Sequence, residues 1–190
     1  DIDLGEIKNT FLIGYGSKYV SCYQLADDGT YLFAATDSGI YYSNWNAPNM
    51  SDYQYWKINE KWGKIETKCI ASAKNGTLFA SKGDTLFSNQ SGYFAPIYTA
   101  TNPIRKIRIS NNHISASIFY RQVELDYLGN VIQQTSTDSR FQNINDAFTD
   151  NQNHTWLADG NTGLGYYHDF YMLKFVPNGP GSIEAFELIS

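Results

Sequence analysis

The sequence predicts an all-β protein with the architecture of a β-propeller, and three observations support this fold class. The chain holds 15 tyrosines, 11 phenylalanines and 4 tryptophans, whereas only 17% of its residues are charged. Aromatic residues favour strands, while helices are richer in Ala, Leu, Glu and Lys. Short alternating runs bounded by Gly, Asn, Asp and Ser recur along the chain, as expected for many short strands. One hairpin pattern also repeats, which separates a propeller from a sandwich.

The repeated hairpin has three clear copies and one degraded copy. The clear copies are "ADDGTYLFAATDSGIYYS" from Ala26, "SAKNGTLFASKGDTLFS" from Ser72 and "TDNQNHTWLADGNTGLGYY" from Thr149. A degraded copy, "SNNHISASIFYRQVELDY" from Ser110, falls before the last one. Each clear copy has a polar turn, a strand with an aromatic residue and small residues, a second turn with glycine, and another strand.

The spacing of the copies fits one four-stranded blade per repeat. When the copies are anchored on Phe33, Phe79, Ser115 and Trp156, the steps are 46, 36 and 41 residues. Intervals of this size are typical of one four-stranded propeller blade each, and a sandwich would not need the same hairpin at every step. We therefore expect about four repeats of four-stranded antiparallel blades.

The elements of the first repeat follow from its alternation and its turns. Val20–Ala26 is the predicted inner strand, Thr30–Thr36 returns, and Ile40–Asn44 leads outward. Tyr53–Ile65 then supplies the outer strand and crosses to the next blade. The expected blade cores lie near residues 20–44, 65–88, 104–128 and 142–168, within a partial propeller of residues 1–176.

Turn chemistry agrees with these hairpins. Gly29, Gly39 and Gly76 stand where a tight turn demands a positive φ, which glycine adopts without steric cost. Asn153 holds the corresponding place in the last repeat, and Asn is well tolerated there.

The third repeat begins with the one basic strand, "NPIRKIRIS". Its isoleucines alternate with its cations once a shift of the strand register by one residue is allowed. This alternation predicts a half-buried strand. The cations are expected on a solvated face, with a pocket for an anionic partner as the alternative; they are Arg105, Lys106 and Arg108.

The last repeat also resembles a relaxed Asp-box, Thr149-x-Asn151-x-Asn153-x-x-Trp156. In such a turn, side-chain oxygens accept backbone N–H groups while the aromatic residue packs between sheets. Lys74 holds the Asp position of the second copy, which is unsuited to a cation site. A structural role is therefore expected.

A calcium site is the alternative for the same segment, and no cofactor is expected otherwise. Oxygen ligands for calcium would come from Asp146, Asp150, Asp159 and Asn161. The spacing of an EF-hand loop is missing. Zinc is disfavoured as well, because the three histidines have no partners at ligand spacing; they are His113, His154 and His168.

Catalysis is not expected. Paired carboxylates for glycoside hydrolysis would be sought among Glu124, Asp126, Asp159 and Asp169, but nothing distinguishes them from turn residues. The chain has no G-x-S-x-G elbow, phosphate-binding loop or dinucleotide fingerprint.

Aromatic residues supply the candidate ligand-binding surface. They gather in the first long connection between repeats, and a second group lies within Ser91–Pro103. Flat rings stack on sugars or polypeptide segments, although outer strands and blade packing also consume aromatic residues. The proposed surface consists of Trp45, Tyr53, Tyr55, Trp56 and Trp62.

Charge and hydropathy exclude two classes of partner. A net charge of -5 offers no basic patch for nucleic acid. No apolar run approaches the roughly 18 residues of a membrane helix, so direct membrane insertion is not expected. Cys22 and Cys69 fall at nearly equivalent places in the first two repeats. Buried free thiols are favoured over a disulfide there, and the redox compartment stays open.

Two longer stretches resemble a known family. "FTDNQNHTWLADGNTGLGYY" resembles the two-component regulator propeller repeat. The run from Glu6 to Trp56 is more specifically similar to the first propeller of PorZ-like proteins of Bacteroidetes, as is "VPNGPGS" near the C-terminus.

The resemblance implies an exported, non-catalytic protein of the periplasm or cell surface. PorZ-like proteins take part in cell-surface attachment by the type IX secretion system, where they help to deliver anionic lipopolysaccharide. The implied partners are glycan, lipopolysaccharide or proteins of a surface complex. The alternative is the periplasmic sensing propeller of a hybrid two-component regulator, which recognises polysaccharide fragments.

The resemblance also implies a larger ring. Propellers of this family have about seven blades, so four repeats suggest part of one, with residues 177–190 as an exit segment towards a following domain. An incomplete ring would expose strand edges, and self-association through such edges is expected.

Overall fold

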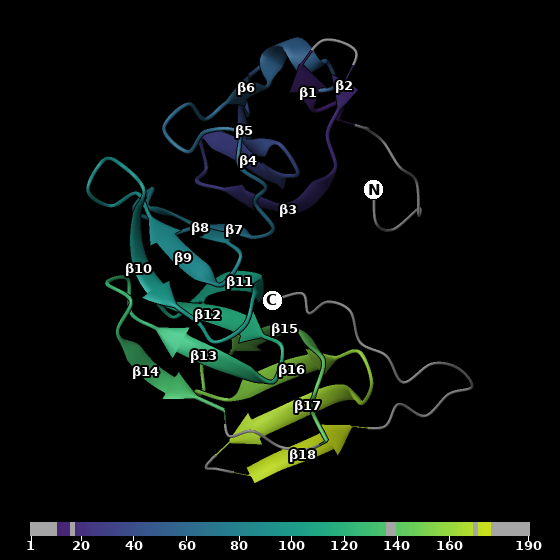
Figure 1. The fold of residues 1–190 in the computed structure, drawn as a ribbon, viewed down its shortest axis with the longest axis vertical. Helices are drawn as coiled ribbons and strands as arrows, with labels where there is room; N and C mark the ends of the chain where they lie inside the picture. Colours follow the sequence, from purple (N-terminus) through teal and green to yellow (C-terminus); the bar gives the residue numbers. More distant parts are fainter. Residues whose placement is uncertain (1–10, 16–17, 136–139, 169–170, 176–190) are drawn as a thin grey trace.

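The computed structural model describes residues 11–15, 18–135, 140–168 and 171–175 (Figure 1). These residues form four antiparallel sheets of four strands each, and within each sheet consecutive strands are neighbours. The first sheet holds β3 (Cys22–Asp27), β4 (Tyr31–Thr36), β5 (Gly39–Asn44) and β6 (Lys57–Ile58). The second holds β7 (Ile70–Ser72), β8 (Leu78–Lys82), β9 (Thr85–Ser88) and β10 (Ala95–Thr99).

The last two sheets repeat this layout. The third holds β11 (Ile104–Ser110), β12 (His113–Ile118), β13 (Arg121–Leu125) and β14 (Val131–Gln134), and the fourth holds β15 (Ile144–Thr149), β16 (Thr155–Asp159), β17 (Gly163–His168) and β18 (Tyr171–Phe175). A small hairpin, β1 (Gly14–Tyr15) with β2 (Lys18–Tyr19), precedes them, and the 3-10 helix η2 (Tyr53–Tyr55) precedes β6.

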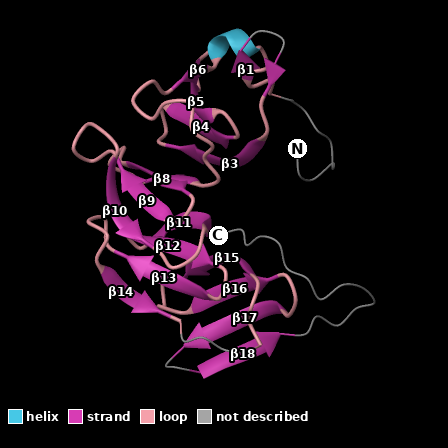
Figure 2. Cartoon of the chain, viewed as in Figure 1, coloured by secondary structure: helices cyan, strands magenta, loops and turns pink. Residues whose placement is uncertain are grey.

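The four sheets are the blades of a propeller. In Figure 1 they follow one another in an arc, with the first sheet at the top and the fourth at the bottom. The first strand of each sheet contacts the first strand of the next, β3 to β7, β7 to β11 and β11 to β15. These strands are therefore the inner strands that surround the axis. Figure 2 shows that strands dominate the described chain. The predicted all-β propeller is confirmed, and the arc of described sheets does not close into a ring.

Each predicted blade core covers the first three strands of one sheet. The fourth strands lie beyond those cores, because outer strands carry weak sequence signals. β6, for example, has only two residues. The expected exit segment, residues 177–190, lies outside the described residues.

The four anchor residues occupy equivalent positions. Phe33, Phe79, Ser115 and Trp156 lie on β4, β8, β12 and β16, the second strand of each sheet. Phe33 packs in a cluster with the second sheet, and Phe79 packs in a cluster with the third. The Ser115 hydroxyl donates to the Ala147 carbonyl of the fourth sheet. The repeated position is thus the one that meets the next blade.

The fourth sheet has no described blade on the face that carries Trp156. Trp156 lies opposite Tyr166, which lies opposite Leu173, so the three share one face. The Trp156 ring also lies 4.9 Å from the Tyr166 ring and 5.7 Å from the Phe175 ring, centroid to centroid. Leu173 is 56% exposed and Phe175 is 43% exposed. We call this surface the open flank.

The hairpin turns have the predicted backbone. Gly29, Gly39 and Gly76 adopt φ of +83°, +124° and +81°, and Asn153 adopts +63°. At Gly39 a side chain is excluded for a second reason, because an added Cβ would lie 2.7 Å from the Gly63 carbonyl oxygen.

The Asp-box prediction is correct about the kind of turn and wrong about the acceptor. Asp150, one residue before Asn151, accepts the backbone N–H groups of Gln152 and His154 through Oδ1 at 2.9 Å each. Its Oδ2 accepts the Trp156 indole N–H at 3.0 Å. The aspartate therefore fixes both the turn and the aromatic residue beside it.

Candidate functional site

The structure separates the five aromatic residues of the predicted ligand surface. Trp62 is 7% exposed and packs edge-on against the rings of Phe87 and Phe94. Its indole N–H donates to the Thr67 hydroxyl at 2.6 Å. Trp62 therefore joins the first sheet to the second and presents little surface to a ligand.

Of the other four aromatic residues, Trp56 packs against the first sheet, Tyr53 and Tyr55 lie in η2, and Trp45 directly follows β5. Trp56 is 5% exposed and donates to the Met50 carbonyl at 2.9 Å. Trp45 and Tyr55 are exposed, and Tyr53 is half-buried. Ligand binding by these residues stays a prediction.

One of these residues, Trp56, lines a pocket beside the first sheet. This first-blade pocket has a volume of about 800 Å³ and lies between the β1–β2 hairpin and the strands β5 and β6. Val20, Tyr41, Trp56 and Ile58 supply apolar and aromatic lining. Charged side chains surround it, namely Lys57, Glu60 and Lys64. Burial, and then the nearby Asp37, raise the pKa of Tyr41, so its hydroxyl stays protonated at neutral pH.

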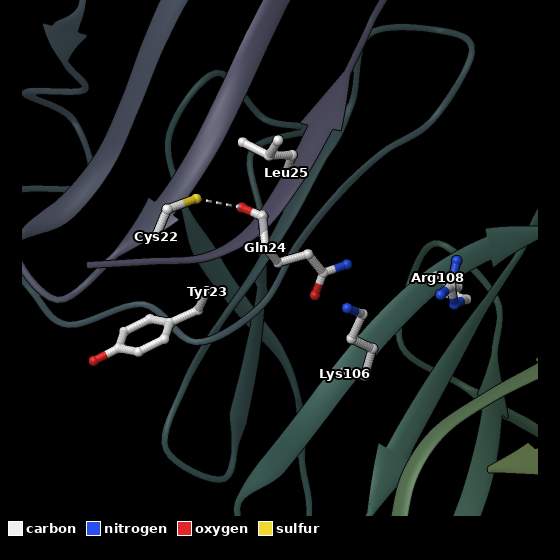
Figure 3. Close-up of a pocket in the computed structure, with 6 residues that line it drawn as sticks. All are labelled: Cys22, Tyr23, Gln24, Leu25, Lys106 and Arg108. Carbon is white, nitrogen blue, oxygen red and sulfur yellow. Dashed lines mark hydrogen bonds between the residues drawn. The ribbon is translucent and has the colours of Figure 1, made fainter. Parts of the chain in front are cut away.

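A second pocket, the axial pocket, lies between the inner strands β3 and β11 (Figure 3). Its volume is about 380 Å³. Gln24 and Lys106 point toward one another across it. The Gln24 side-chain amide donates to the Ile107 carbonyl at 2.8 Å, which ties the first blade to the third at the axis.

The two cysteines are free thiols. The expectation of a buried thiol is confirmed for Cys69 and is wrong for Cys22, which is exposed and lines the axial pocket. Burial raises the pKa of the Cys22 thiol despite a hydrogen bond to the Gln24 carbonyl. Burial also raises the pKa of Cys69 to about 11. Because the thiolate is the reactive form, neither cysteine is activated as a nucleophile.

The basic strand does not form a solvated face, and that expectation is wrong for two of its cations. The predicted slip is present as a register shift between Ile104 and Lys106, as at a β-bulge. Arg108 donates two hydrogen bonds to the buried carboxylate of Asp146, from Nε to Oδ1 at 2.9 Å and from Nη2 to Oδ2 at 2.6 Å. Arg105 donates to Asn143 and Asn145. Both arginines therefore join the third blade to the fourth.

A third pocket, the rim pocket, opens where these inner strands begin. It has a volume of about 470 Å³ and is lined by Lys68, Pro103, Ile104, Arg105, Asn143 and Asn145. The sequence suggested an anion pocket at the basic strand as an alternative. It did not predict the rim pocket itself, because the residues that line this pocket come from three blades.

The carboxylates considered for calcium already have protein donors. Asp146 accepts hydrogen bonds from Arg108. Asp150 accepts backbone N–H groups of its own hairpin turn. Asp159 accepts the backbone N–H groups of Asn143, Asn161 and Thr162 at 2.7, 2.9 and 2.8 Å. Within the described residues, no three His, Cys, Asp or Glu side chains gather as a metal site.

The carboxylates considered for hydrolysis also make folding contacts. Glu124 is buried between His113 and Thr149, with Oε1 3.1 Å from the imidazole Nδ1 and Oε2 3.3 Å from the Thr149 hydroxyl. The Asp126 carboxylate accepts a hydrogen bond from the Asn130 side chain within the same loop. This bond is the largest of several hydrogen bonds that lower the pKa of Asp126. Asp169 lies outside the described residues.

No protein-family model matches the chain, and no curated protein matches it. No helix in the described part of the chain has the length and apolar character that crossing a membrane requires.

Solved structures are similar in fold. PorZ, a surface component of the type IX secretion system of Porphyromonas gingivalis, superposes with a TM-score of 0.62 at 12% identity, over 99% of this chain and 23% of PorZ. The extracellular domain of the putative one-component system BT4673 of B. thetaiotaomicron gives 0.61 at 12% identity, over 91% of this chain and 25% of that one. The WD40 propeller domain of Doa1 gives 0.63 at 8% identity, over 87% and 56%.

These likenesses support the propeller fold of the described blades. The chain spans about a quarter of the PorZ and BT4673 chains and about half of the Doa1 domain. Its arc of four sheets therefore corresponds to part of each of these longer chains. The chain has the fold of a partial β-propeller, and the resemblance to PorZ and to the extracellular regulator propeller is confirmed at the level of fold, not of sequence.

Proposed function

We propose that this chain is a non-catalytic binding or scaffold module that acts outside the cytoplasm, in the periplasm or at the cell surface. Its ligand is a glycan, including lipopolysaccharide, or a protein of a surface complex. The first-blade pocket is the observation that carries the proposal. Its volume of about 800 Å³ falls within the range of about 300 to 1,000 Å³ that is typical of ligand sites.

The lining of this pocket suits a sugar. Tyr41, Trp56 and Ile58 provide apolar contact area, against which the C–H face of a pyranose can pack. Lys57, Glu60 and Lys64 at its border offer charged hydrogen-bond donors and acceptors for hydroxyl groups. No acid–base pair is needed for such binding.

The cellular setting rests on the structural neighbours. PorZ is described as a bacterial surface component, and BT4673 contributes an extracellular domain. Both descriptions support the proposed export of this chain, and a role in cell-surface attachment is proposed from the resemblance to PorZ-like proteins.

A sensing role is the second candidate, and the likeness to the BT4673 extracellular domain favours it. In that role a polysaccharide fragment would bind the propeller more tightly in one arrangement of a signalling dimer than in another.

A glycan array screened with the chain tests the proposal. Oligosaccharides that bind are then titrated by isothermal calorimetry and assayed for released reducing ends. We expect binding without hydrolysis, and at least a threefold weaker affinity for Lys64→Ala. Lys74→Ala is the control, because Lys74 is exposed on a turn of the second blade.

Three results would contradict it. Turnover of a bound glycan would exclude a non-catalytic role. Equal affinity of the Lys64 and Lys74 variants would exclude the first-blade pocket as the site. Absence of binding to every glycan and to surface proteins from the source cell would exclude the binding function itself.

A further inference from the structure

The Arg105 side chain is held in place at the rim pocket. Its Nη1 donates to the Asn145 side-chain oxygen at 3.0 Å and also to the Asn143 side-chain oxygen. Its guanidinium carbon lies 4.1 Å from the centre of the Phe119 ring, a cation–π geometry. Two amides and a ring thus fix the guanidinium before any ligand arrives.

The electrostatic role of Arg105 differs from that of Arg108. Asp146 is the ion-pair partner of Arg108, at 2.6 Å. The hydrogen-bond acceptors described for Arg105 are amide and carbonyl oxygens, which orient its charge without cancelling it. Burial lowers the pKa of Arg105 in spite of the field of Asp159, but an arginine keeps its proton in proteins.

Lys68 brings a second cation to the same pocket. Its ammonium lies 2.6 Å from Glu66 and 3.7 Å from the centre of the Tyr23 ring. The Lys68 and Glu66 side chains are 48% and 54% exposed, and exposed ion pairs contribute only about 0 to 1 kcal/mol. Lys68 can therefore exchange Glu66 for an anionic ligand at little cost.

We propose that the rim pocket binds an oxyanion, meaning a carboxylate, sulfate or phosphate group, carried by a ligand of this propeller. The planar guanidinium of Arg105 matches the two oxygens of such a group, and Lys68 lines the same pocket and adds a second positive charge. Pro103 and Ile104 form an apolar floor beside them. This site is separate from the first-blade pocket, so the proposal goes beyond the proposed function and does not depend on it.

Isothermal titration calorimetry of the chain with trigalacturonate, with the neutral galactotriose, and with inorganic phosphate and sulfate tests the proposal. We expect binding of trigalacturonate or of the inorganic anions, no binding of galactotriose at this pocket, and weaker binding as sodium chloride rises. The carboxylate and inorganic arms distinguish which oxyanion is preferred.

Variants locate the site. Arg105→Gln should weaken anion binding at least tenfold and Lys68→Gln several-fold, whereas Lys74→Gln, on an exposed turn of the second blade, should leave it unchanged. Glu66→Gln should tighten binding two- to threefold, because it removes the anion that competes for Lys68. Chemical shifts of the Arg105 side chain on titration give a readout in the unchanged protein if Arg105→Gln fails to fold.

The proposal is overturned if none of the anions binds, if galactotriose displaces a bound anion as effectively as trigalacturonate does, or if Lys74→Gln weakens anion binding as much as Arg105→Gln does. It also fails if Glu66→Gln leaves the affinity unchanged while the Arg105 resonances do not move. A glycan that binds normally to the Arg105→Gln variant through the first-blade pocket would leave the proposed function intact.

Discussion

At the scale of single residues, tryptophans of one loop region take opposite roles. Trp45 is 46% exposed, while Trp62, 17 residues later, is buried between two blades. Neither the residue type nor its sequence neighbours distinguishes the two. What distinguishes them is the second sheet, whose Phe87 and Phe94 cover Trp62.

We expect Trp62→Ala to lower the free energy of unfolding by about 3–5 kcal/mol, as for other buried tryptophans, because it empties the contact between two blades. Trp45→Ala should change it by no more than about 0.5 kcal/mol. Guanidinium denaturation followed by far-ultraviolet circular dichroism measures both. A loss of equal size in the two variants would contradict the different burial of the two indoles.

Gly165 is a second residue whose constraint is set by a distant part of the chain. An added Cβ there would lie 2.3 Å from Cε1 of Phe141. Gly165→Ala should therefore cost about 1–3 kcal/mol through overpacking. Phe141→Leu in the same chain should recover part of that loss in a thermal melt, and a purely additive double variant would argue against the contact.

At the scale of the element, Asx side chains shape the hairpins. In the first blade, Asp28 Oδ1 accepts the N–H groups of Thr30 and Tyr31, and Asp150 plays this part in the fourth. These hydrogen bonds join residues close in sequence, so such turns can be predicted from the sequence. In the fourth blade the acceptor is Asp150, one residue before the Asn151 of the predicted Asp-box.

Asp150 gives its hairpin a dependence on pH. Burial opposes ionisation of its carboxyl, but hydrogen bonds, first from the Trp156 indole, outweigh burial and lower its pKa below the ordinary 3.8. A carboxyl whose folded-state pKa is lowered stabilises the fold above its ordinary pKa, and this stabilisation is lost as the pH falls through the lowered value.

We therefore expect Asp150→Asn to cost about 1 kcal/mol at pH 7, in line with a lost charge-assisted hydrogen bond, and to cost progressively less below pH 4. Urea denaturation at pH 7, 4 and 2.5 provides the comparison, with Asn151→Ser as the uncharged control on the same turn. A penalty that does not change with pH would refute the role of the carboxylate.

At the scale of the whole molecule, polar side chains join the blades as much as apolar clusters do. Arg108 on the third blade binds Asp146 on the fourth, and the Asp146 side chain is fully buried. Removing one member of a buried pair leaves a charge without its partner. Asp146→Ala should thus destabilise the chain by about 3–5 kcal/mol.

The double variant Arg108→Met with Asp146→Leu should recover most of that loss, because it buries apolar groups of similar size in place of the pair. A double-mutant cycle in urea measures the coupling. Additive single and double effects would show that the pair does not link the two blades.

Among the described residues, the arc of blades ends at the fourth blade, which exposes the open flank. The expected association surface was the backbone edge of a strand, but the open flank offers a side-chain face with Leu173 and Phe175 exposed beside Trp156. Exposed apolar faces of this kind promote association.

Size-exclusion chromatography with light scattering should show a dimer fraction of this chain that grows with concentration. Leu173→Lys should shift the chain to monomer, whereas Val131→Lys, at an exposed position of the third blade, should not. A monomer at every concentration would exclude association through this face.

The sequence by itself determined the all-β class, the repeat and the turns of this protein. These features rest on local physics, namely the two-residue period of strands, the positive φ of Gly29 or Asn153, and short-range Asx hydrogen bonds. The equivalence of the anchor positions followed from the same repeat.

The tertiary structure alone decided which side chains line each pocket. The first-blade pocket forms where the β1–β2 hairpin lies over strands that follow it in sequence, and the rim pocket joins Lys68 and Arg105 to Asn143. Those residues are brought together by the stacking of successive blades around the axis. Because stacking depends on contacts between residues far apart in the chain, the alternation within one strand specifies which side chains are buried but not which of them meet.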